Sequence, residues 1–424
     1  MRYSVGIDVG GTFTDLFLHD SESGRFWIGK TPSTPQDQSI GVLEGVRQIC
    51  ETAGIDSAAI EQILHGTTVA TNAVLESKGS RVGLVITEGW SQLLHLAESW
   101  TPGPLFGFFT YVKPEPLVDY EDIREAPERM DAKGEVIRGL DEDAARIAVR
   151  ELRDAGVEAL TVCLLNSYAN PAHELRLKTI AEEELSGTAV PVSISSEITP
   201  EFREYERVTT TVMNSYVGPI LQRYLGNLEA RLREGGVDAP VQVVRSDGGL
   251  QSVQAAREHP VQTVLSGPSG GVNGAAFVAH TAGFDRILTF DMGGTSTDVA
   301  HFDGAYERAF DTEVAGVVKD WLLIGLSVLI YASAVNRLFE IDPRTNGLTP
   351  NGQGLFNGSP GKPQITPDGT KVLIPILNPG LAQSSLTVID LTAGVRVGLT
   401  LALQGVLLDR VRAIEDAAHA KLGL

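Results

Sequence analysis

Two short stretches of the chain repeat one pattern of residue types that can bind a phosphate group. The first reads VGIDVGGTFTD over Val5–Asp15, and the second reads FDMGGTSTD over Phe290–Asp298. Each contains or follows an apolar run that predicts a buried strand, and a repeat of this extent indicates an internal duplication. The positions shared by the two copies are Asp8/Asp291, Gly10/Gly293, Gly11/Gly294, Thr12/Thr295, Thr14/Thr297 and Asp15/Asp298.

The glycine pair of each copy predicts a phosphate cradle. A glycine turn has no Cβ in the way, so its backbone N–H groups can point together at an anion, and a threonine hydroxyl adds a donor. The alternative is that each pair is only a tight hairpin turn. Two matched copies favour the cradle, in two related lobes whose hairpins face each other across a cleft. The predicted phosphate contacts are Gly10, Gly11, Thr12, Thr14, Gly293, Gly294, Thr295 and Thr297.

An aspartate ends the predicted strand before each glycine pair. Asp8 and Asp291 therefore lie where a divalent cation bridging phosphate oxygens needs a carboxylate. Mg²⁺ prefers oxygen ligands and keeps several of its waters, so one carboxylate beside each hairpin would suffice. We predict that both aspartates are metal ligands with a catalytic role.

Two further glycine turns follow predicted strands. In His65-Gly66-Thr67-Thr68, a strand meets a helix start, which suits an anion. His65, Thr67 and Thr68 are candidate substrate contacts, with a capped helix start as the structural alternative. Asp247 lies in a turn after the strand Val241–Arg245, where open α/β sheets place ligands. It is a candidate for catalysis, and an ordinary Asp-Gly turn explains it equally well.

A run of small residues, Ser266–Gly271, opens the predicted helix Val272–Ala282. Its glycines would let a phosphate or ribose approach the helix start closely. Gly267, Gly270 and Gly271 are therefore predicted nucleotide contacts.

Strands and helices alternate along the rest of the first part of the chain, which predicts an α/β protein with a parallel or mixed sheet. The clearest helices are predicted at 35–52, 141–155 and 171–185. A helical region from Pro200 to Arg233 is expected to break at Gly218-Pro219. Its charge cluster, from Glu201 to Arg207, fits a solvated helix face better than a site.

At these motifs the chain resembles the ATPases of the actin, sugar-kinase and heat-shock-chaperone type (ribonuclease H-like lobes), and within them the hydantoinase/oxoprolinase A-subunit group. The resemblance covers about residues 3 to 315. It also includes Glu204-Tyr205-Glu206-Arg207, which is similar to a motif of the group. Two further segments, Trp100–Leu105 and Lys113–Leu117, look closest to the beta subunits of the acetone and acetophenone carboxylases.

The resemblance implies an ATP-dependent enzyme that uses Mg²⁺, or alternatively Mn²⁺. It implies the opening of a cyclic amide, such as a hydantoin or 5-oxoproline, by a subunit that works with a hydantoinase B-type partner. The alternatives are ATP-dependent ketone carboxylation as a beta subunit, and a catalytically degenerate nucleotide-binding fragment. A small molecule is the expected substrate.

Composition narrows the partners further. The chain has 424 residues, 42% apolar and 21% charged, as in soluble globular proteins. Its net charge of −20 argues against nucleic acid and anionic membranes. Cys50 and Cys163 lie in apolar contexts, which indicates free thiols in a reducing compartment. With no signal peptide pattern, we expect a cytoplasmic protein.

We expect three parts: residues 1–190, residues 191–315 with the second phosphate motif, and an atypical segment at 316–424. The group would continue to a glycine turn that closes over adenosine, which is not recognisable here. Leu322–Val335 is nearly uncharged and is predicted to be a buried or interface helix, too short to span a membrane. Strands around a Pro-Asp-Gly turn at 367–369 resemble a β-propeller blade, and 405–422 predicts a terminal helix.

Overall fold

The structure is a computed structural model of the whole chain, and it describes most residues up to Phe302 and separate strands beyond. Residues 98–114, residues 293–295 and the predicted helix at 405–422 lie outside the described residues. Described are 2–34, 36–97, 115–292, 296–302, 304–306, 308–314, 317–324, 329–332, 337–342, 347–350, 359–360, 364–365, 371–378, 383–390 and 403–404.

The chain divides into two compact units. The first comprises Met1–Gly294, Asp298–Ser327 and Ile341–Gly347, and the second comprises Thr295–Thr297, Val328–Glu340 and Leu348–Leu424. All described parts of the candidate site except Thr297 belong to the first unit. Among the described residues, no helix is both long and apolar enough to cross a membrane.

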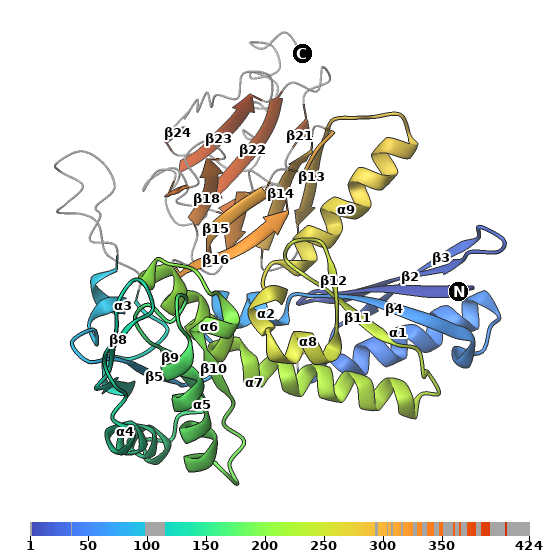
Figure 1. The fold of residues 1–424 in the computed structure, drawn as a ribbon. Coiled ribbons are helices and arrows are strands. Elements are labelled where there is room, and N and C mark those ends of the chain that lie inside the picture. The colour runs from blue at the N-terminus through green and yellow to red at the C-terminus, as the bar shows by residue number, and fades with distance from the viewer. Residues whose placement is uncertain are drawn as a thin grey trace. The chain divides into compact units, whose positions relative to one another are not determined.

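A six-stranded mixed sheet carries the first sequence motif (Figure 1). Its order is β12-β11-β4-β1-β2-β3. β1 and β2 form the predicted antiparallel hairpin, and β1, β4 and β11 are parallel neighbours, so their carboxyl ends meet at one edge. The strands are β1 (Tyr3–Val9), β2 (Phe13–Asp20), β3 (Phe26–Pro32), β4 (Ile60–Thr67), β11 (Val241–Val244) and β12 (Leu250–Ser252).

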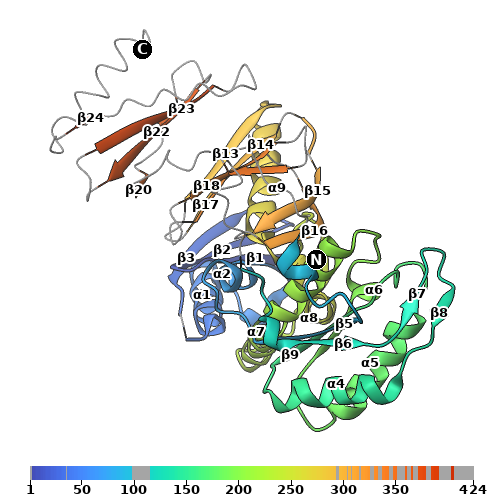
Figure 2. The same ribbon diagram turned by 90° about the vertical axis from the view of Figure 1, so that its left-hand side faces the viewer.

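Two helices, α1 (Gln38–Ala53) and α7 (Glu204–Glu234), lie side by side and close one face of this sheet (Figures 1 and 2). The Asp37 side chain caps the start of α1 by accepting a hydrogen bond from the Ser39 N–H, and Gly54 ends the helix in the left-handed conformation. Apolar side chains of both helices and of β1, β2 and β4 form one buried core.

Helix α7 continues through Pro219 without the expected break, so that prediction was wrong. A proline inside a helix removes one backbone hydrogen bond and costs about 3 kcal/mol. Nearly every residue from Glu206 to Gly218 is buried, and this packing outweighs the local preference. The helix therefore spans the length between the two sheets of the first unit.

The charge cluster at the start of α7 is a solvated face only in part: Glu201 and Arg203 are exposed, as the preferred interpretation expected, whereas the last two charges are buried, which corrects it. Arg207 is fully buried, and its guanidinium donates to the Ser167 hydroxyl at 2.7 Å and to the Leu164 carbonyl at 2.9 Å. Glu206 is also buried. A buried arginine needs such partners, because an unpaired charge in the core is costly.

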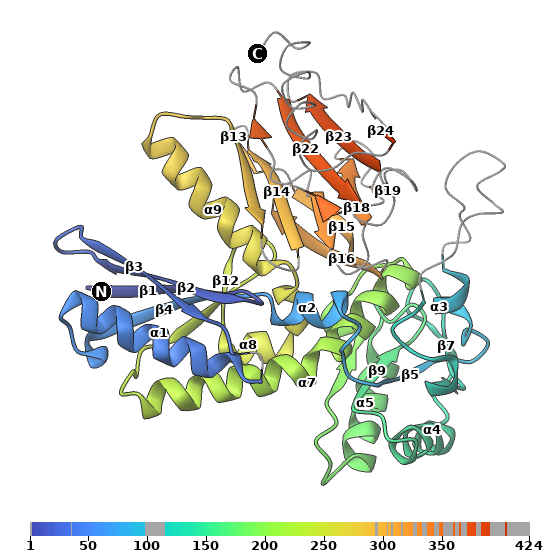
Figure 3. The ribbon, with the colours of Figure 1, turned by 180° about the vertical axis from the view of Figure 1, so that it is seen from behind.

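The second sheet of the first unit is parallel, with the order β10-β9-β5-β6. Helices α4 and α5 pack on one face (Figure 2), and α7 packs on the other (Figure 3). This confirms the helices predicted near 141–155 and 171–185. The bounds are β5 (Val82–Thr87), β6 (Ile123–Ala126), β9 (Ala159–Cys163), β10 (Val192–Ile194), α4 (Glu142–Asp154) and α5 (Ala172–Glu184), with the hairpin β7 (Arg129–Met130) and β8 (Val136–Arg138) beside them.

Shorter helices connect these layers. They are α2 (Val69–Leu75), α3 (Leu93–Leu96), α6 (Ser195–Ile198) and α8 (Val253–Glu258), and the longer α9 (Ser266–Thr281) follows. Turns of 3₁₀-helix occur at Ser57–Ala59, Tyr120–Asp122 and Pro260–Thr263. Both cysteines are buried and free.

The predicted apolar helix at Leu322–Val335 was wrong where the structure describes it, since this run lies in β16 (Val317–Ile324) and β17 (Leu329–Ala332). A short apolar run fits a buried strand as well as a helix, and Gly325 interrupts the run. The two strands flanking the Pro-Asp-Gly sequence, and the third strand, are present as antiparallel neighbours β21, β22 and β23.

The other strands beyond α9 are β13 (Ile287–Met292), β14 (Ser296–Phe302), β15 (Arg308–Val314), β18 (Arg337–Asp342), β19 (Gly347–Pro350), β20 (Ser359–Pro360), β21 (Gln364–Ile365), β22 (Lys371–Asn378), β23 (Gln383–Asp390) and β24 (Leu403–Gln404). β15 pairs with β16, and β17 pairs with β18, both antiparallel.

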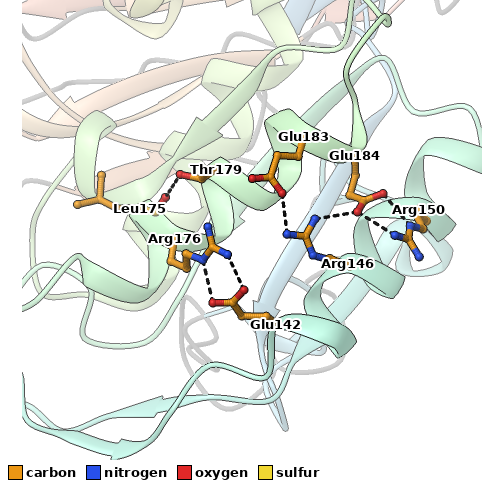
Figure 4. Close-up of polar contacts among 8 residues, drawn as sticks. All are labelled: Glu142, Arg146, Arg150, Leu175, Arg176, Thr179, Glu183 and Glu184. Carbon is orange, nitrogen blue, oxygen red and sulfur yellow. Dashed lines mark hydrogen bonds and ion pairs between the residues drawn. The ribbon is translucent and has the colours of Figure 1, made fainter.

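Arginine–glutamate pairs tie α4 to α5 (Figure 4). Glu184 accepts hydrogen bonds from Arg150 at 2.7 and 2.9 Å and from Arg146 at 2.9 Å. These bonds, from Arg150 first and Arg146 second, lower the pKa of Glu184 from 4.5 to about 2. Arg176 pairs with Glu142 in the same way, at 2.8 Å and 2.5 Å.

This lowered pKa predicts how stability depends on pH. A carboxyl whose pKa is lower in the folded state stabilises the fold above its unfolded pKa, near 4.5, and this contribution disappears as pH falls toward 2. Glu184→Gln should therefore lower the urea midpoint at pH 7, and the difference from the unsubstituted chain should shrink below pH 4.5. Glu183→Gln, which loses one contact of a half-exposed side chain, is the control and should change the midpoint less. A pH-independent difference for Glu184→Gln would contradict the assignment.

Candidate functional site

The carboxyl ends of β1, β4 and β11 bring three of the sequence motifs together. Asp8 lies near the end of β1, Gly66 near the end of β4, and Ser246 two residues after β11. Helix α9 packs against both β4 and β11. The edge of a parallel sheet beside the start of a helix is where open α/β folds bind ligands.

Glycines surround the Asp8 carboxylate. A Cβ placed on Gly66 would lie 3.2 Å from Asp8 Oδ1, and one on Gly267 would lie 3.8 Å from the same oxygen. The Asp8 residue is exposed, whereas its neighbours Ile7 and Val9 are buried. Glycines from two different elements thus leave open space around one strand-terminal carboxylate, which fits a phosphate or its metal ion.

The β1–β2 hairpin has a tight turn, and one of its predicted contacts points inward. The Gly10 N–H donates to the Phe13 carbonyl at 3.0 Å, and Gly11 and Thr12 are exposed. Thr14 is fully buried and shares a hydrogen bond of 3.1 Å with the Ser33 hydroxyl. Thr14 therefore supports the hairpin from inside instead of facing a ligand.

Ser33 supports the hairpin turn, although no sequence pattern selects it. Its hydroxyl donates to the Gly10 carbonyl at 2.8 Å, and its backbone N–H donates to the Thr12 carbonyl at 2.9 Å. Together with its contact to Thr14, these bonds fix the hairpin turn from the end of β3. No local pattern indicates this, because Ser33 lies 19 to 23 residues from its partners.

The β4–α2 turn is fixed to the end of β1 by Thr68. Both its backbone N–H and its hydroxyl donate to the Val9 carbonyl, at 3.1 and 3.0 Å. Asn72 donates in turn to the Thr68 hydroxyl at 3.1 Å. Thr68 is partly exposed, so among the three predicted substrate contacts of this turn it is the one that a ligand could reach.

His65 and Thr67 are fully buried, which fits the structural alternative. His65 Nε2 lies 2.9 Å from the Tyr224 hydroxyl, and burial lowers the pKa of His65 from 6.5 to about 4, so the ring is neutral at pH 7. The Thr67 hydroxyl accepts from the Val69 N–H at 3.2 Å, at the start of α2. Neither side chain reaches the surface.

Asp247 forms contacts within its own turn. Its carboxylate accepts from Arg245 at 2.6 Å and from the Gly249 N–H at 2.9 Å. Helix α9 holds the turn in place, because the Ser269 hydroxyl donates to the Ser246 carbonyl at 2.5 Å and the Asn273 amide donates to the Gly248 carbonyl at 3.1 Å. These contacts fit the turn interpretation, and the catalytic role of Asp247 stays a prediction.

Helix α9 begins at Ser266, so the glycine run lies inside the helix and does not precede Val272 as expected. Leu265, before it, has a φ of 67°, a conformation rare for residues other than glycine. No side chain caps this helix start. A Cβ on Gly271 would meet no atom within 4 Å, and one on Gly270 would meet only Val244.

The second motif has the same local arrangement as the first. Asp291 lies in β13 and Thr297 in β14, which are hydrogen-bonded neighbours separated by three residues, as β1 and β2 are. Gly293, Gly294 and Thr295 lie outside the described residues, and whether the two hairpins face each other stays a prediction. Within the described part of the chain, no group of three or more His, Cys, Asp or Glu could hold a metal.

Sequence comparison identifies the family. The hydantoinase/oxoprolinase N-terminal region matches residues 4–185, and the hydantoinase/oxoprolinase region matches residues 207–350. The chain belongs to the hydantoinase/oxoprolinase family. The match extends beyond residue 315, where we expected the resemblance to end.

Two relatives with named activities support this family assignment. The acetophenone carboxylase gamma subunit of Aromatoleum aromaticum is 36% identical over 70% of this chain and 42% of its own length. Caprolactamase subunit alpha of Pseudomonas jessenii is 34% identical over 70% and 43%. The chain thus spans less than half the length of these relatives.

The solved structures confirm the predicted fold class. A nucleotide-free acetone carboxylase structure has a TM-score of 0.72 at 29% identity, over 82% of this chain and 50% of that one. The ATP-dependent caprolactamase from P. jessenii has a TM-score of 0.67 at 31% identity, over 77% and 48%. The chain has the α/β fold of these ATP-dependent enzymes.

The space beside Asp8 can be tested with a pair of glycines on α9. Gly267→Ala would place a methyl group 3.4 Å from Thr68 Cγ2 and 3.8 Å from Asp8 Oδ1, whereas Gly274→Ala would meet no atom within 4 Å. Both changes should raise helix stability, by roughly 0.5–1 kcal/mol. Only Gly267→Ala should weaken binding of a Mg²⁺-nucleotide, measured by calorimetry. Equal affinities for the two variants would show that this space is not part of the site.

Proposed function

We propose that this chain is an ATP-dependent hydrolase of cyclic amides, of the hydantoin or 5-oxoproline type, and a subunit of a larger complex. The observation that carries the proposal is the Asp8 carboxylate at the sheet edge, next to Gly66 and Gly267, in a chain of the hydantoinase/oxoprolinase family. The space that these glycines leave fits a nucleotide phosphate.

Bound ATP would supply a phosphoryl group that makes a carbonyl or amide oxygen a good leaving group. The chain's own residues would bind and orient the phosphates. Gly10, Gly11 and Thr12 would offer hairpin donors, and the uncapped start of α9 would add the positive end of its dipole. Gly293, Gly294, Thr295 and Thr297 would do the same from the second copy.

Asp8 and Asp291 are proposed to hold Mg²⁺, or Mn²⁺, mostly through its waters. A Mg²⁺ ion bound with nucleotide commonly uses one or two carboxylates of the protein, so a single aspartate from each copy fits this chemistry. Charge neutralisation at the phosphates would then supply much of the catalysis.

Ketone carboxylation is the second candidate. It is favoured by the identity of 36% to the acetophenone carboxylase gamma subunit and by the TM-score of 0.72 with acetone carboxylase. Both reactions would use the same activation of a carbonyl oxygen, so the phosphate site does not discriminate between them. The substrate must do so.

A partner subunit of the hydantoinase B type is part of the proposal. It is supported by relatives that are named as subunits, including caprolactamase subunit alpha. The net charge of −20 disfavours nucleic acid and anionic membranes as partners. We propose a cytoplasmic enzyme, in keeping with the two free cysteines.

ATP hydrolysis by the purified chain, measured against a panel of cyclic amides and ketones with and without a candidate partner, tests the proposal. Stimulation by a hydantoin, a lactam or 5-oxoproline supports the amide hydrolase. Stimulation by a ketone with bicarbonate supports the carboxylase instead. Nucleotide binding without turnover under every condition would identify a degenerate nucleotide-binding protein.

The metal role of the aspartates gives a separate prediction. Asp8→Asn and Asp291→Asn each remove a charge but little volume, so each should weaken binding of a Mg²⁺-ATP analogue roughly tenfold. With EDTA the difference should vanish. Asp15→Asn is the matched control, because Asp15 lies in the same hairpin but pairs with Lys30 at 2.7 Å. Affinities equal to that of the unsubstituted chain, with Mg²⁺ and with EDTA, would mean that neither aspartate holds a metal.

A further inference from the structure

The hydroxyl of Tyr224 lies beneath the candidate site, on the core side of the sheet. Tyr224 belongs to α7 and is 5% exposed. Its hydroxyl lies 2.9 Å from His65 Nε2, and the Thr67 side chain lies near enough to act on the pKa of Tyr224, which burial raises and Thr67 lowers. One phenol group therefore bonds to His65 and lies beside Thr67, the two residues that flank Gly66.

The alternation of side chains along β4 shows how the Tyr224 contact relates to Asp8. Successive residues of a strand point to opposite faces. His65 and Thr67 both reach the Tyr224 side, so Gly66 between them faces the other way. On that side a Cβ on Gly66 would lie 3.2 Å from Asp8 Oδ1. Tyr224 and Asp8 thus lie on opposite sides of the same short backbone segment.

Because His65 is buried, losing its hydrogen bond to Tyr224 would be costly. His65 is fully buried, and its Nδ1 atom interacts with the Ile7 backbone but at a geometry too poor for a regular hydrogen bond. The Tyr224 hydroxyl is then the one partner of good geometry for this ring among the described residues. A buried polar group that loses its partner costs about 1–3 kcal/mol, so the strand end would shift to recover one.

Thr67 extends the same connection to α2. Its hydroxyl accepts a hydrogen bond from the Val69 N–H at 3.2 Å, and the next residue, Thr68, bonds to the Val9 carbonyl beside Asp8. A displacement of Thr67 would therefore be transmitted to the end of β1. Helix α7, through the Tyr224 hydroxyl, can therefore set the positions of Thr67 and of the end of β1.

We propose that Tyr224 is a positioning residue of the phosphate site, whose hydroxyl holds the Gly66–Thr68 turn against Asp8. The proposal rests on the proposed function for the nature of the ligand. It goes beyond that function by assigning a role to a buried residue that touches neither nucleotide nor substrate.

Tyr224→Phe tests the hydroxyl alone, since the ring and its packing remain. Tyr216→Phe is the matched control: Tyr216 lies on the same helix and is 8% exposed, its ring fills the space beside Gly79, and its hydroxyl forms no hydrogen bond within the described residues. We expect Tyr224→Phe to weaken binding of a Mg²⁺-ATP analogue about tenfold and Tyr216→Phe to leave it unchanged. Equal affinities for the two variants would overturn the proposal.

Amide hydrogen exchange of the ligand-free chain gives a readout that does not depend on nucleotide. Exchange at residues 66–69 should accelerate in Tyr224→Phe and not in Tyr216→Phe, while exchange in α4 and α5 stays unchanged. If the unsubstituted chain binds no nucleotide, the proposed function fails and the exchange result alone decides whether Tyr224 positions the turn. Unchanged exchange at residues 66–69 would overturn the positioning role.

A double-mutant cycle separates positioning from a general loss of stability. Thr67→Val removes the hydroxyl that lies near Tyr224 while keeping the side chain's shape. If the contact carries the effect, Tyr224→Phe should cost little further nucleotide affinity in the Thr67→Val background. Two independent, additive losses would show that Tyr224 acts through the fold in general and not through Thr67.

Discussion

The burial of α7 is the constraint on which the rest of the first unit depends. At its start Arg207 bonds the loop after β9, further along the Ser215 hydroxyl accepts from Thr161 in β9 at 2.7 Å, and Tyr224 bonds β4. One helix thus supplies core to both sheets. At 1.5 Å per residue, the 17 positions from Arg207 to Tyr224 span about 25 Å. The packing of α7 explains why the helix continues through Pro219, because the burial offsets the cost of a proline inside a helix.

Local chemistry was predictable from the sequence, and long-range support was not. The hairpin around Gly10, the turn at Gly66 and the strand that ends near Asp8 follow from residue types and spacing over a few positions. Ser33 and Tyr224 do not, because Ser33 contacts residues 19 to 23 positions away and Tyr224 contacts a residue 159 positions away. Arg207 shows the same limit: its partners Ser167 and Leu164 lie at least 40 positions earlier, so its charge suggested a solvated face.

The alternating side-chain directions along β4 decide which of the predicted site residues are buried and which are exposed. The prediction grouped His65, Thr67 and Thr68 as ligand contacts because a glycine turn makes every nearby polar group plausible. The strand sends His65 and Thr67 into the core and leaves Thr68 at the edge. Period-2 alternation could have separated them in advance, had the strand been known to continue to Thr67. The strand boundary, a weak point of any sequence pattern, decided the outcome.

Electrostatics sets a final condition on the proposed site. A polyphosphate must approach a chain with a net charge of −20 and come to rest near the Asp8 carboxylate. The neutral His65 ring contributes no positive charge from below, since its pKa is about 4. The helix start at Ser266 supplies roughly half a charge. On the proposed function, the remaining attraction would come from a cation between phosphate and carboxylate. In this protein, metal and nucleotide are therefore expected to bind as one unit, and Tyr224 affects both by fixing where that carboxylate lies.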